Sequence, residues 1–293
     1  MTFTAFVFAV ALPAVANERL DHEWQIHDEE TNEVTDRVDD LDFLKSDLPE
    51  DHTESFFGTE PETRDDEISN KSLIGINKLR KITNTNRVPN RMVGHLSNGC
   101  TATVVSYNHV LTAAHCVYNF KTKTWKKNLK FIPGRNGSNV KPYGEWKIRR
   151  KIASKKYTQE GKIQWDVAIG IVKEKNGTSV GEYTGWMSFG YKNSLSVNNK
   201  VNILGYPGNK PTGTQWSAFC PIKKIQSQYM YHNCDTAPGN SGSPMYSYSQ
   251  EEGKRIIRGV HTNGFKDGQT KLNSGPRINK TLFELLNRWV IES

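Results

Sequence analysis

Long apolar segments, cofactor motifs and clustered cysteines are missing from most of this 293-residue sequence. Outside residues 3–16, no stretch approaches the roughly 18 apolar residues of a membrane-spanning helix, so we expect no membrane partner. The four cysteines include no C-x-x-C pair, the spacing typical of zinc sites, and we expect neither a metal nor a cofactor. No nucleic-acid-binding motif is recognisable, so we expect no nucleic-acid partner.

The long apolar segment lies at the amino terminus. Residues 3–16 are small or apolar and end in Ala14-Val15-Ala16, followed by the polar Asn17. This pattern is typical of a secretory signal peptide with an A-x-A cleavage site, although it lacks a basic start. A buried first strand is the alternative. We therefore expect residues 1–16 to be removed and the protein to be secreted into the extracellular space.

The four cysteines are an even set in a chain that we expect to be exported, which predicts two disulfides. Their positions in the sequence favour neighbouring partners, Cys100 with Cys116 and Cys220 with Cys234. Closing a loop of about 15 residues stabilises a fold by roughly 3 kcal/mol in the chain-entropy model. Free or metal-bound thiols are the alternative.

Charge is distributed unevenly along the sequence. Residues 17–71 hold 20 Asp and Glu against 5 Lys and Arg, whereas residues 72–293 hold 34 Lys and Arg against 11 Asp and Glu. An acidic segment of this kind has few means to fold alone, but it can lie against a basic partner. We interpret residues 17–71 as an acidic propeptide that binds the rest of its own chain; a solvated acidic tail is the alternative. The basic remainder can attract acidic substrates.

From Arg91 onward, short runs of β-favouring residues alternate with Gly, Asn and Pro. Many short strands separated by turn residues predict an all-β barrel or sandwich, here two packed barrels that divide near Gly181. One firm helix is expected over residues 281–291, capped by Thr281, because apolar residues recur there at helical spacing. The expected strands cover residues 101–107, 110–113, 165–172, 201–204 and 255–262.

Three short segments carry residues suited to nucleophilic catalysis. Between Cys234 and Pro244, Ser241 lies among glycines and small residues, where the backbone can turn sharply and expose its N–H groups. His115 follows a predicted strand and adjoins a cysteine whose disulfide would hold it in place as a general base. Asp166 lies inside an apolar strand, where an unpaired carboxylate is costly. Each alone is also compatible with a plain role: Ser241 with a surface turn, His115 with a structural or surface histidine, and Asp166 with a strand-edge residue.

Together, His115, Asp166 and Ser241 occur in the chain order of the chymotrypsin-like serine peptidases, which these motifs resemble. An α/β-hydrolase would place the serine first and within G-x-S-x-G, but Ser243 stands two residues after Ser241. The resemblance extends to the secreted glutamyl endopeptidases, a branch of that superfamily, from about Ser72 to the carboxyl-terminal helix. The similar motifs are Ser72-Leu73-Ile74-Gly75, Ile82-Thr83-Asn84-Thr85, Pro133-Gly134-Arg135-Asn136-Gly137, Gly205-Tyr206-Pro207-Gly208, Gly213-Thr214-Gln215-Trp216 and Val260-His261-Thr262-Asn263-Gly264.

The resemblance implies a fold of two packed six-stranded antiparallel β-barrels with a carboxyl-terminal helix. The peptidase domain would span residues 72–293, with the first barrel at about 72–180, the second at about 181–280 and the helix at 281–291. Substrates would be proteins or peptides, and we expect a monomer.

The resemblance also assigns roles to residues. Ser241 would be the nucleophile, His115 its general base and later the acid, and Asp166 the group that orients His115. The backbone N–H groups of Gly239 and Ser241 would form the oxyanion hole, where losing one donor typically costs about 3 kcal/mol or more of transition-state stabilisation.

In that family a histidine and a threonine receive the Glu side chain of the substrate, and the matching positions are His261 and Thr236. An imidazole and a hydroxyl can both donate hydrogen bonds to a carboxylate, which predicts a preference for Glu and then Asp. Asp235 opposes this interpretation, because trypsin-type enzymes carry at that position the Asp that binds Lys or Arg. A Lys/Arg-specific peptidase is therefore one alternative function, and an inactive homologue used as a basic binding module is another.

Asn240 precedes Ser241, at the position where trypsin-type zymogens carry an Asp that pairs with the new amino terminus. That ion pair cannot form here. In the glutamyl branch, the freed amino terminus instead helps to shape the substrate pocket. We therefore expect another protease to cut after Lys71 and to leave Ser72 as part of this pocket.

Overall fold

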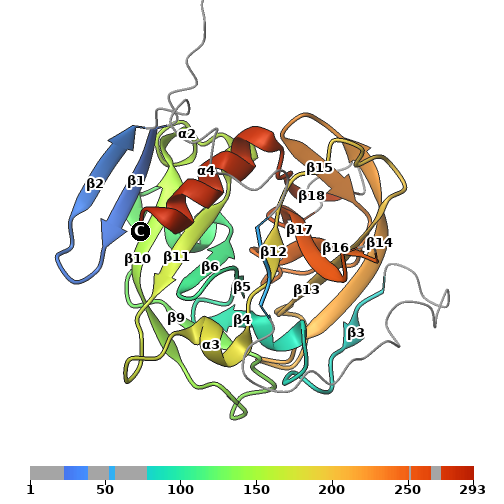
Figure 1. Cartoon of the computed structure of the whole chain (residues 1–293), viewed down its shortest axis with the longest axis horizontal. Helices are drawn as coiled ribbons and strands as arrows, with labels where there is room; N and C mark the ends of the chain where they lie inside the picture. Colours follow the sequence, from blue (N-terminus) through green and yellow to red (C-terminus); the bar gives the residue numbers. More distant parts are fainter. Residues whose placement is uncertain (1–22, 39–52, 57–77, 251, 265–271) are drawn as a thin grey trace, which may run out of the picture.

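The computed structural model describes residues 23–38, 53–56, 78–250, 252–264 and 272–293. Over these residues the chain forms two large β-sheets that lie side by side, with few helices between and beside them (Figure 1). No described helix is both long enough and apolar enough to cross a membrane. The predicted signal peptide and Ser72 lie outside the described residues.

The first sheet contains a closed barrel of six antiparallel strands. Strand β11 pairs with β6 on one edge and with β10 on the other, and this pairing closes the ring. Strands β5 and β11 are buried along their whole length, as expected for runs of Val, Ile, Ala and Thr inside a barrel. The six strands are β4 (Val93–Leu96), β5 (Thr101–Val104), β6 (His109–Thr112), β9 (Lys130–Pro133), β10 (Trp146–Ser154) and β11 (Ala168–Val172).

The second sheet has six antiparallel strands in the order β17-β16-β13-β14-β15-β18. A bridge between Gly259 and Arg277 brings the two ends of this order together. The expected architecture of two barrels followed by a helix is confirmed. The strands are β13 (Lys200–Gly205), β14 (Trp216–Ile225), β15 (Tyr229–His232), β16 (Pro244–Ser249), β17 (Lys254–Val260) and β18 (Asn273–Pro276), with β12 (Ser188–Phe189) beside β17 and β3 (Arg80–Lys81) beside β14.

Short helices and turns connect these strands. A two-stranded hairpin, formed by β7 and β8, follows helix α1. These elements are η2 (Asn90–Met92), α1 (Ala114–Val117), β7 (Tyr118–Asn119), β8 (Thr124–Trp125), α2 (Lys155–Thr158), η3 (Ile163–Trp165) and α3 (Val180–Thr184).

Helix α4 (Lys280–Ile291) ends the chain and buries one face in the larger hydrophobic core. The helical spacing of the sequence predicted this face, which consists of Leu282, Leu285, Leu286 and Trp289. The predicted cap was wrong. Asn279, not Thr281, caps the helix, and its side-chain oxygen accepts a hydrogen bond of 2.9 Å from the backbone N–H of Leu282.

Both predicted disulfides are confirmed. Cys100 is bonded to Cys116 with their Cα atoms 6.0 Å apart, and Cys220 is bonded to Cys234 with their Cα atoms 5.1 Å apart. The first bond joins the residue directly before β5 to α1, and the second joins β14 to the loop after β15. Each therefore holds the start of a segment in which the sequence places a candidate functional residue.

Part of the acidic segment is folded against the rest of the chain. Strands β1 (Glu23–Asp28) and β2 (Val34–Val38) form a hairpin, and β1 pairs with β10 at the outer edge of the first sheet. Residues 53–56 bind a second place, next to β12. An acidic segment that lies against its own basic chain is what the charge distribution predicted, but its β-structure was not foreseen.

Candidate active site

Ser241 lies in a tight loop between β15 and β16, residues 233–243, which we call the serine loop. Gly239 and Gly242, on either side of it, have φ angles of 102° and 87°, which side-chain-bearing residues rarely adopt. There is also no space for a side chain. A Cβ on Gly239 would lie 2.4 Å from the Tyr206 carbonyl oxygen, and one on Gly242 would lie 2.0 Å from that of Thr101. The glycines of this loop are therefore required by both backbone conformation and packing.

This loop is bonded to both sheets. The Thr101 backbone N–H in β5 donates to the Ser241 carbonyl at 2.8 Å, and the Thr101 hydroxyl donates to the Gly239 carbonyl at 2.9 Å. The Gly242 N–H donates to the His261 carbonyl at 2.8 Å. In contrast, the N–H groups of Gly239 and Ser241 have no acceptor among the described residues. Two neighbouring donors are thus available to an oxygen of a ligand.

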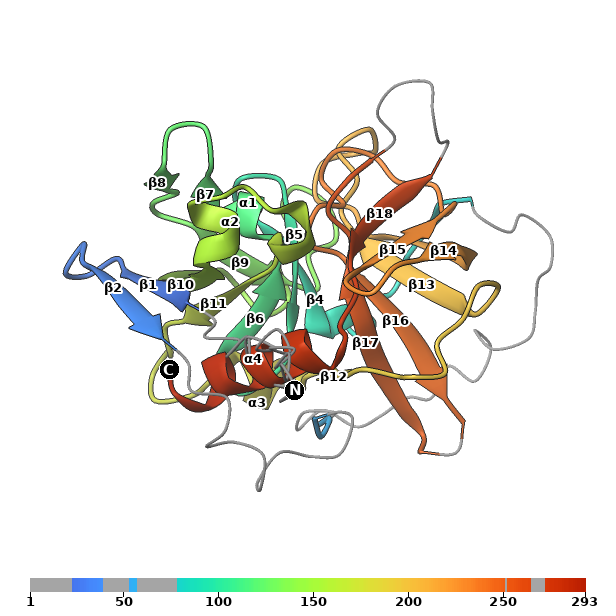
Figure 2. The same ribbon diagram turned by 90° about the horizontal axis from the view of Figure 1, so that it is seen from above.

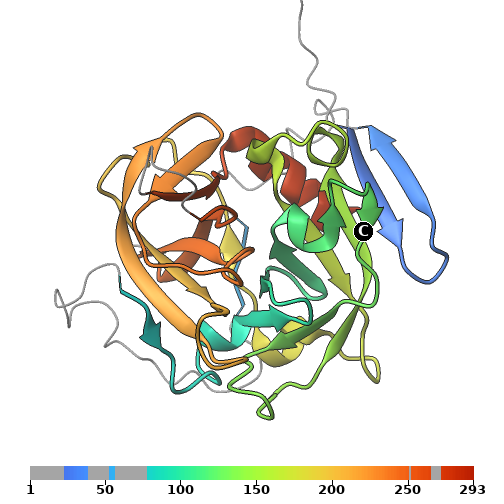
Figure 3. The same ribbon diagram turned by 180° about the vertical axis from the view of Figure 1, so that it is seen from behind.

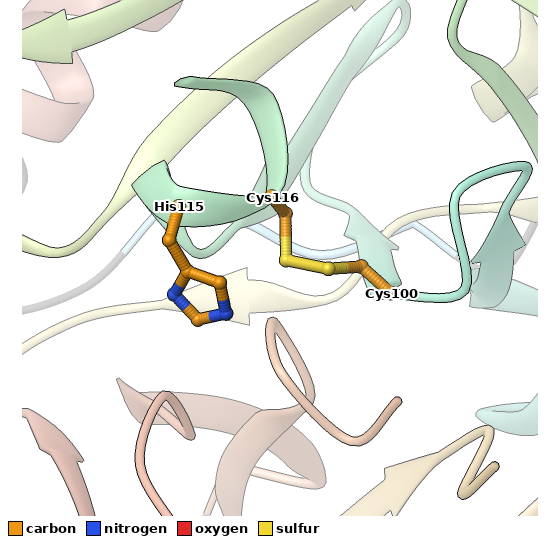
Figure 4. A group of neighbouring side chains, drawn as sticks. All are labelled: Cys100, His115 and Cys116. Atoms are coloured by element: carbon orange, nitrogen blue, oxygen red, sulfur yellow. A yellow bond between two sulfur atoms is a disulfide. The ribbon is translucent and has the colours of Figure 1, made fainter. Parts of the chain in front are cut away.

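His115 lies in α1, directly before one half of the Cys100–Cys116 disulfide (Figure 4). Its backbone N–H donates to Asp166 Oδ1 at 2.9 Å, and its ring Nδ1 lies 2.8 Å from Asp166 Oδ2. One carboxylate thus holds both the main chain and the ring. Asp166 is 4% exposed, whereas the His115 side chain is 33% exposed, so the far side of the imidazole faces the solvent.

Asp166 does not lie within a strand, as the sequence suggested. It follows the 3-10 turn η3, with φ −74° and ψ 62°, and β11 begins two residues later at Ala168. In a strand, successive side chains point to opposite faces, which would fix Asp166 relative to the barrel interior. The turn instead lets the carboxylate meet α1, which belongs to a different part of the barrel.

The second sheet brings the loop with Ser241 next to the helix that carries His115. The sulfur of Cys116, the neighbour of His115, lies 3.7 Å from the Ser241 carbonyl oxygen. Seen from behind, the green helix α1 faces orange loops of the second sheet (Figure 3). The described residues include no hydrogen bond between the Ser241 hydroxyl and His115. Such contacts are often long before a substrate binds.

A buried pair of histidines lies behind this loop. His261 is 2% exposed, and its Nδ1 lies 3.2 Å from Nε2 of His232. Burial lowers the pKa of His232 to about 3 and holds the pKa of His261 well below its usual range. Both rings are therefore neutral near pH 7. Sequence analysis missed His232, and its position two residues before Cys234 was the available signal.

The remaining predicted pocket residues differ in exposure. Thr236 is half-buried, whereas Asp235 beside it is exposed. Asn240 is completely buried, and both polar atoms of its side chain lack a hydrogen-bond partner among the described residues. Thr236 is therefore more shielded from solvent than Asp235, and His261, which directly follows β17, is buried.

Among the described residues, two groups of histidine and cysteine side chains are close enough together to hold a metal ion. They consist of Cys100, His115 and Cys116, and of Cys220, His232 and Cys234. In both groups the two sulfur atoms are bonded to each other. These sulfurs are therefore not thiolates, the form that binds zinc.

Comparison with known families identifies the architecture. Residues 80–282 match the family model for trypsin. The chain belongs to the trypsin family. It is 32% identical over 225 residues to a glutamyl endopeptidase of Bacillus licheniformis, a match that covers 75% of this chain and 69% of that protein. A protein of Bacillus subtilis named extracellular metalloprotease is 31% identical over 249 residues, 81% of this chain and 76% of that protein.

A solved structure supports the same assignment. The structure of a Glu endopeptidase in complex with MPD matches with a TM-score of 0.64 and 27% identity, over 74% of this chain and 99% of that one. Within the trypsin family, the chain thus belongs to the glutamyl endopeptidase branch, and it is a serine endopeptidase.

Proposed function

We propose that this serine endopeptidase is secreted, is made as a zymogen, and cuts proteins or peptides after Glu and less readily after Asp. Its triad would be Ser241, His115 and Asp166. Ser241 Oγ attacks the scissile carbonyl while His115 Nε2 takes its proton, and His115 then gives this proton to the leaving amine. Water hydrolyses the resulting acyl-enzyme by the same route. The double contact of Asp166 with His115 supports these roles.

The two unoccupied N–H groups in the serine loop suit the charge that develops in this reaction. In the transition state the carbonyl oxygen becomes an oxyanion, and donors fixed in advance stabilise it most. Gly239 and Ser241 supply such donors, because the hydrogen bonds from Thr101 hold the loop in shape. We assign the oxyanion hole to them.

The His261–His232 pair is the observation that carries the preference for Glu. If His232 Nε2 donates to His261 Nδ1, His261 is left with a proton on Nε2, which can donate to a substrate carboxylate. Thr236 can supply a second donor from its hydroxyl. Because the family's freed amino terminus lies at the same pocket, Ser72 would add a positive charge there after cleavage behind Lys71.

The exposure of Asp235 weighs against Lys/Arg specificity. A carboxylate selects a basic side chain strongly when it is shielded from water, because solvent weakens charge interactions. Asp235 is exposed, whereas His261 is 2% exposed. The side chain shielded from solvent beside the serine loop is thus a hydrogen-bond donor rather than an acid.

A cleavage-site profile on a mixed peptide library tests the proposal. The full chain, purified and then cut behind Lys71, should cut substrates after Glu, whereas the Ser241→Ala protein treated in the same way should not. Replacing His261 with Leu should lower kcat/KM for Glu substrates by roughly 10- to 100-fold, the effect of losing a hydrogen bond to a charged group. Asp235→Asn is the control and should leave the Glu preference unchanged. Cuts after Lys or Arg that Asp235→Asn abolishes would instead support the trypsin-type alternative.

A further inference from the structure

The acidic arm, which we define as residues 23–38 and 53–56, completes the peptidase body rather than lying loosely on it. Strand β10 pairs with β11 along one edge, but on the other edge β9 pairs only with Trp146 and Lys147. Strand β1 covers the rest of that edge, with Trp24 opposite Ser154 and Asp28 opposite Arg150. Without β1, these backbone groups of β10 would form an exposed edge.

Trp24 anchors this strand in the main hydrophobic core. Its side chain is 1% exposed, and its ring centroid lies 6.0 Å from that of Trp289 in α4. His27 of the same strand stacks on Trp125, with centroids 5.6 Å apart and rings 12° from parallel. Removing the arm would expose Trp289 and Trp125 on the body and leave a hole in the core.

A buried charge pair also joins arm and body. Lys151 of β10 donates to Glu29 of the arm, and the two side chains are 0% and 4% exposed. The Asn128 backbone N–H also donates to Glu29, at 3.0 Å. If Glu29 left, Lys151 would have to become hydrated or lose its proton, because an unpaired charge is costly to bury.

The arm also binds next to β12, between the two sheets. Thr53 N–H donates to the Phe189 carbonyl at 2.9 Å, and Phe56 and Trp186 exchange two backbone hydrogen bonds of 3.2 and 2.7 Å. The rings of Phe56 and Trp186 lie 4.7 Å apart. The arm thus contacts the molecule at two distant places, and each contact supports the other through the chain that joins them.

Neither contact lies at the serine loop. Seen from above, residues 53–56 lie on the side of α4, opposite α1 with its His115, and the β1–β2 hairpin lies at the outer edge of the first sheet (Figure 2). In its described parts, the arm has no hydrogen bond or ion pair with His115, Asp166 or Ser241. The match to the family model likewise begins at residue 80, so the arm lies outside the matched part of the chain.

We propose that the acidic arm stays bound after the activating cut, as a second, non-covalent chain of the active enzyme. It would act as a permanent subunit that fills the core and covers the β10 edge, not as an inhibitor that must leave. This inference rests on the proposed cleavage between the arm and the body, but it does not depend on the substrate preference.

The test uses the full chain with Ser241→Ala, so that no self-digestion occurs. Residues 66–71 are replaced by the recognition sequence of a site-specific protease that cuts directly before Ser72. After cutting, size-exclusion chromatography and native mass spectrometry at micromolar protein should find arm and body together in a 1:1 complex. Recovery of the body alone, with the arm as a separate species, would overturn the proposal.

Two variants examine the anchors. Trp24→Ala should weaken retention of the arm by roughly 100-fold or more, as expected for emptying a buried tryptophan site. Val38→Ala is the control, because Val38 is 62% exposed on the same hairpin, and it should retain the arm normally. If Trp24→Ala does not fold, Glu29→Gln keeps the shape and removes the charge, and it should weaken retention at least tenfold. Equal retention by the control and the folded anchor variant would contradict this account.

The readout is physical association in an inactive variant. A failure to retain the arm would therefore leave the proposed Glu preference untouched. Conversely, the absence of cleavage after Glu would not affect whether the arm remains bound.

Discussion

Two hydrogen bonds that His115 donates to one carboxylate define its position. Asp166 accepts hydrogen bonds from the backbone N–H and from the ring of His115. The carboxylate therefore fixes the rotation of the imidazole and selects the tautomer with the proton on Nδ1. The other ring nitrogen is then left as a base that points away from Asp166. An Asn in place of Asp166 could present its amide N–H to the ring, which would favour the other tautomer of His115.

The variant Asp166→Asn should therefore lower kcat on a peptide substrate by about 10⁴-fold, with a much smaller change in folding stability. Stopped-flow or steady-state assays of the activated protein measure the first quantity, and thermal unfolding measures the second. Glu145→Gln serves as the control, because Glu145 pairs with Lys130 and Lys141 at the surface. A loss of less than tenfold in Asp166→Asn would contradict the orienting role.

A candidate site residue could be recognised in the sequence where a local motif surrounds it. Ser241 is marked by the glycines that its loop requires, and His115 by the cysteine beside it. His232 has no such motif, because its role depends on His261, a residue 29 positions away that reaches it only when β15 and the end of β17 come together. The exposure of Asp235 is likewise a property of the folded loop.

At the scale of single elements, helix α4 links the core to the end of the chain. Its apolar face packs inward, and its first turn depends on Asn279, which caps the helix and also donates from its amide to the Ser227 carbonyl at 3.1 Å. Both groups of one side chain are thus used, one inside the helix and one outside it.

Asn279→Ala should lower the free energy of unfolding by about 1–2 kcal/mol, the usual effect of removing a cap. Urea unfolding of the Ser241→Ala protein gives this quantity directly. Thr281→Ala is the matched control, and it should change stability by less than about 0.5 kcal/mol, because Ala is favourable inside a helix. The opposite order of the two effects would return the cap to Thr281.

Elements were predicted best where their residues alternate with clear turn residues. Strands at residues 101–107 and 110–113 were foreseen; β5 ends three residues earlier than predicted, and β6 has the predicted length but begins one residue earlier. The start of β11 was placed too early, because Trp165 and Asp166 look like strand residues but form a turn. Strand β1 was not foreseen, since three of its six side chains, Glu23, His27 and Asp28, are charged or titratable and it becomes a strand only by pairing with β10.

At the scale of the whole molecule, buried neutral histidines couple stability to pH. Burial lowers the pKa of His95 and of His109 to about 4, and that of His232 to about 3, from an ordinary value of 6.5. The unfolded chain therefore takes up protons at a higher pH than the folded protein does. Stability from these groups is complete above about pH 6.5 and is lost as the pH falls toward 4.

The Ser241→Ala protein should thus unfold at lower urea concentration at pH 5 than at pH 7.5. Each histidine contributes at most roughly 1.4 kcal/mol per pH unit in this range, above the titration of most carboxyl groups. His109→Gln should make the free energy of unfolding less dependent on pH, because it removes one of these titrating groups. His109 lies away from the serine loop, against Ser293 at the chain end. A free energy of unfolding that is constant between pH 6.5 and 5 would exclude the effect.

Opposite charge brings the acidic arm and the basic body together, but it does not explain how they fit. Most ion pairs between them are partly exposed, such as that of Glu30 with Lys173, and pairs of this kind contribute little. Trp24 in the core and Glu29 beside Lys151 distinguish a specific contact from general attraction. The charge distribution in the sequence could predict that the arm binds the basic body, but not where on the body it binds.

The sequence alone determined the β-rich class, the neighbouring disulfides, the terminal helix and the order of His115, Asp166 and Ser241. These features follow from local patterns, because turn residues, apolar spacing and nearby cysteines act over a few positions. Only the tertiary structure decided the turn that holds Asp166, the histidine behind His261 and the strand formed by the acidic arm. Each of these depends on surfaces far apart in the chain, and packing and burial select such contacts only after the sheets have formed.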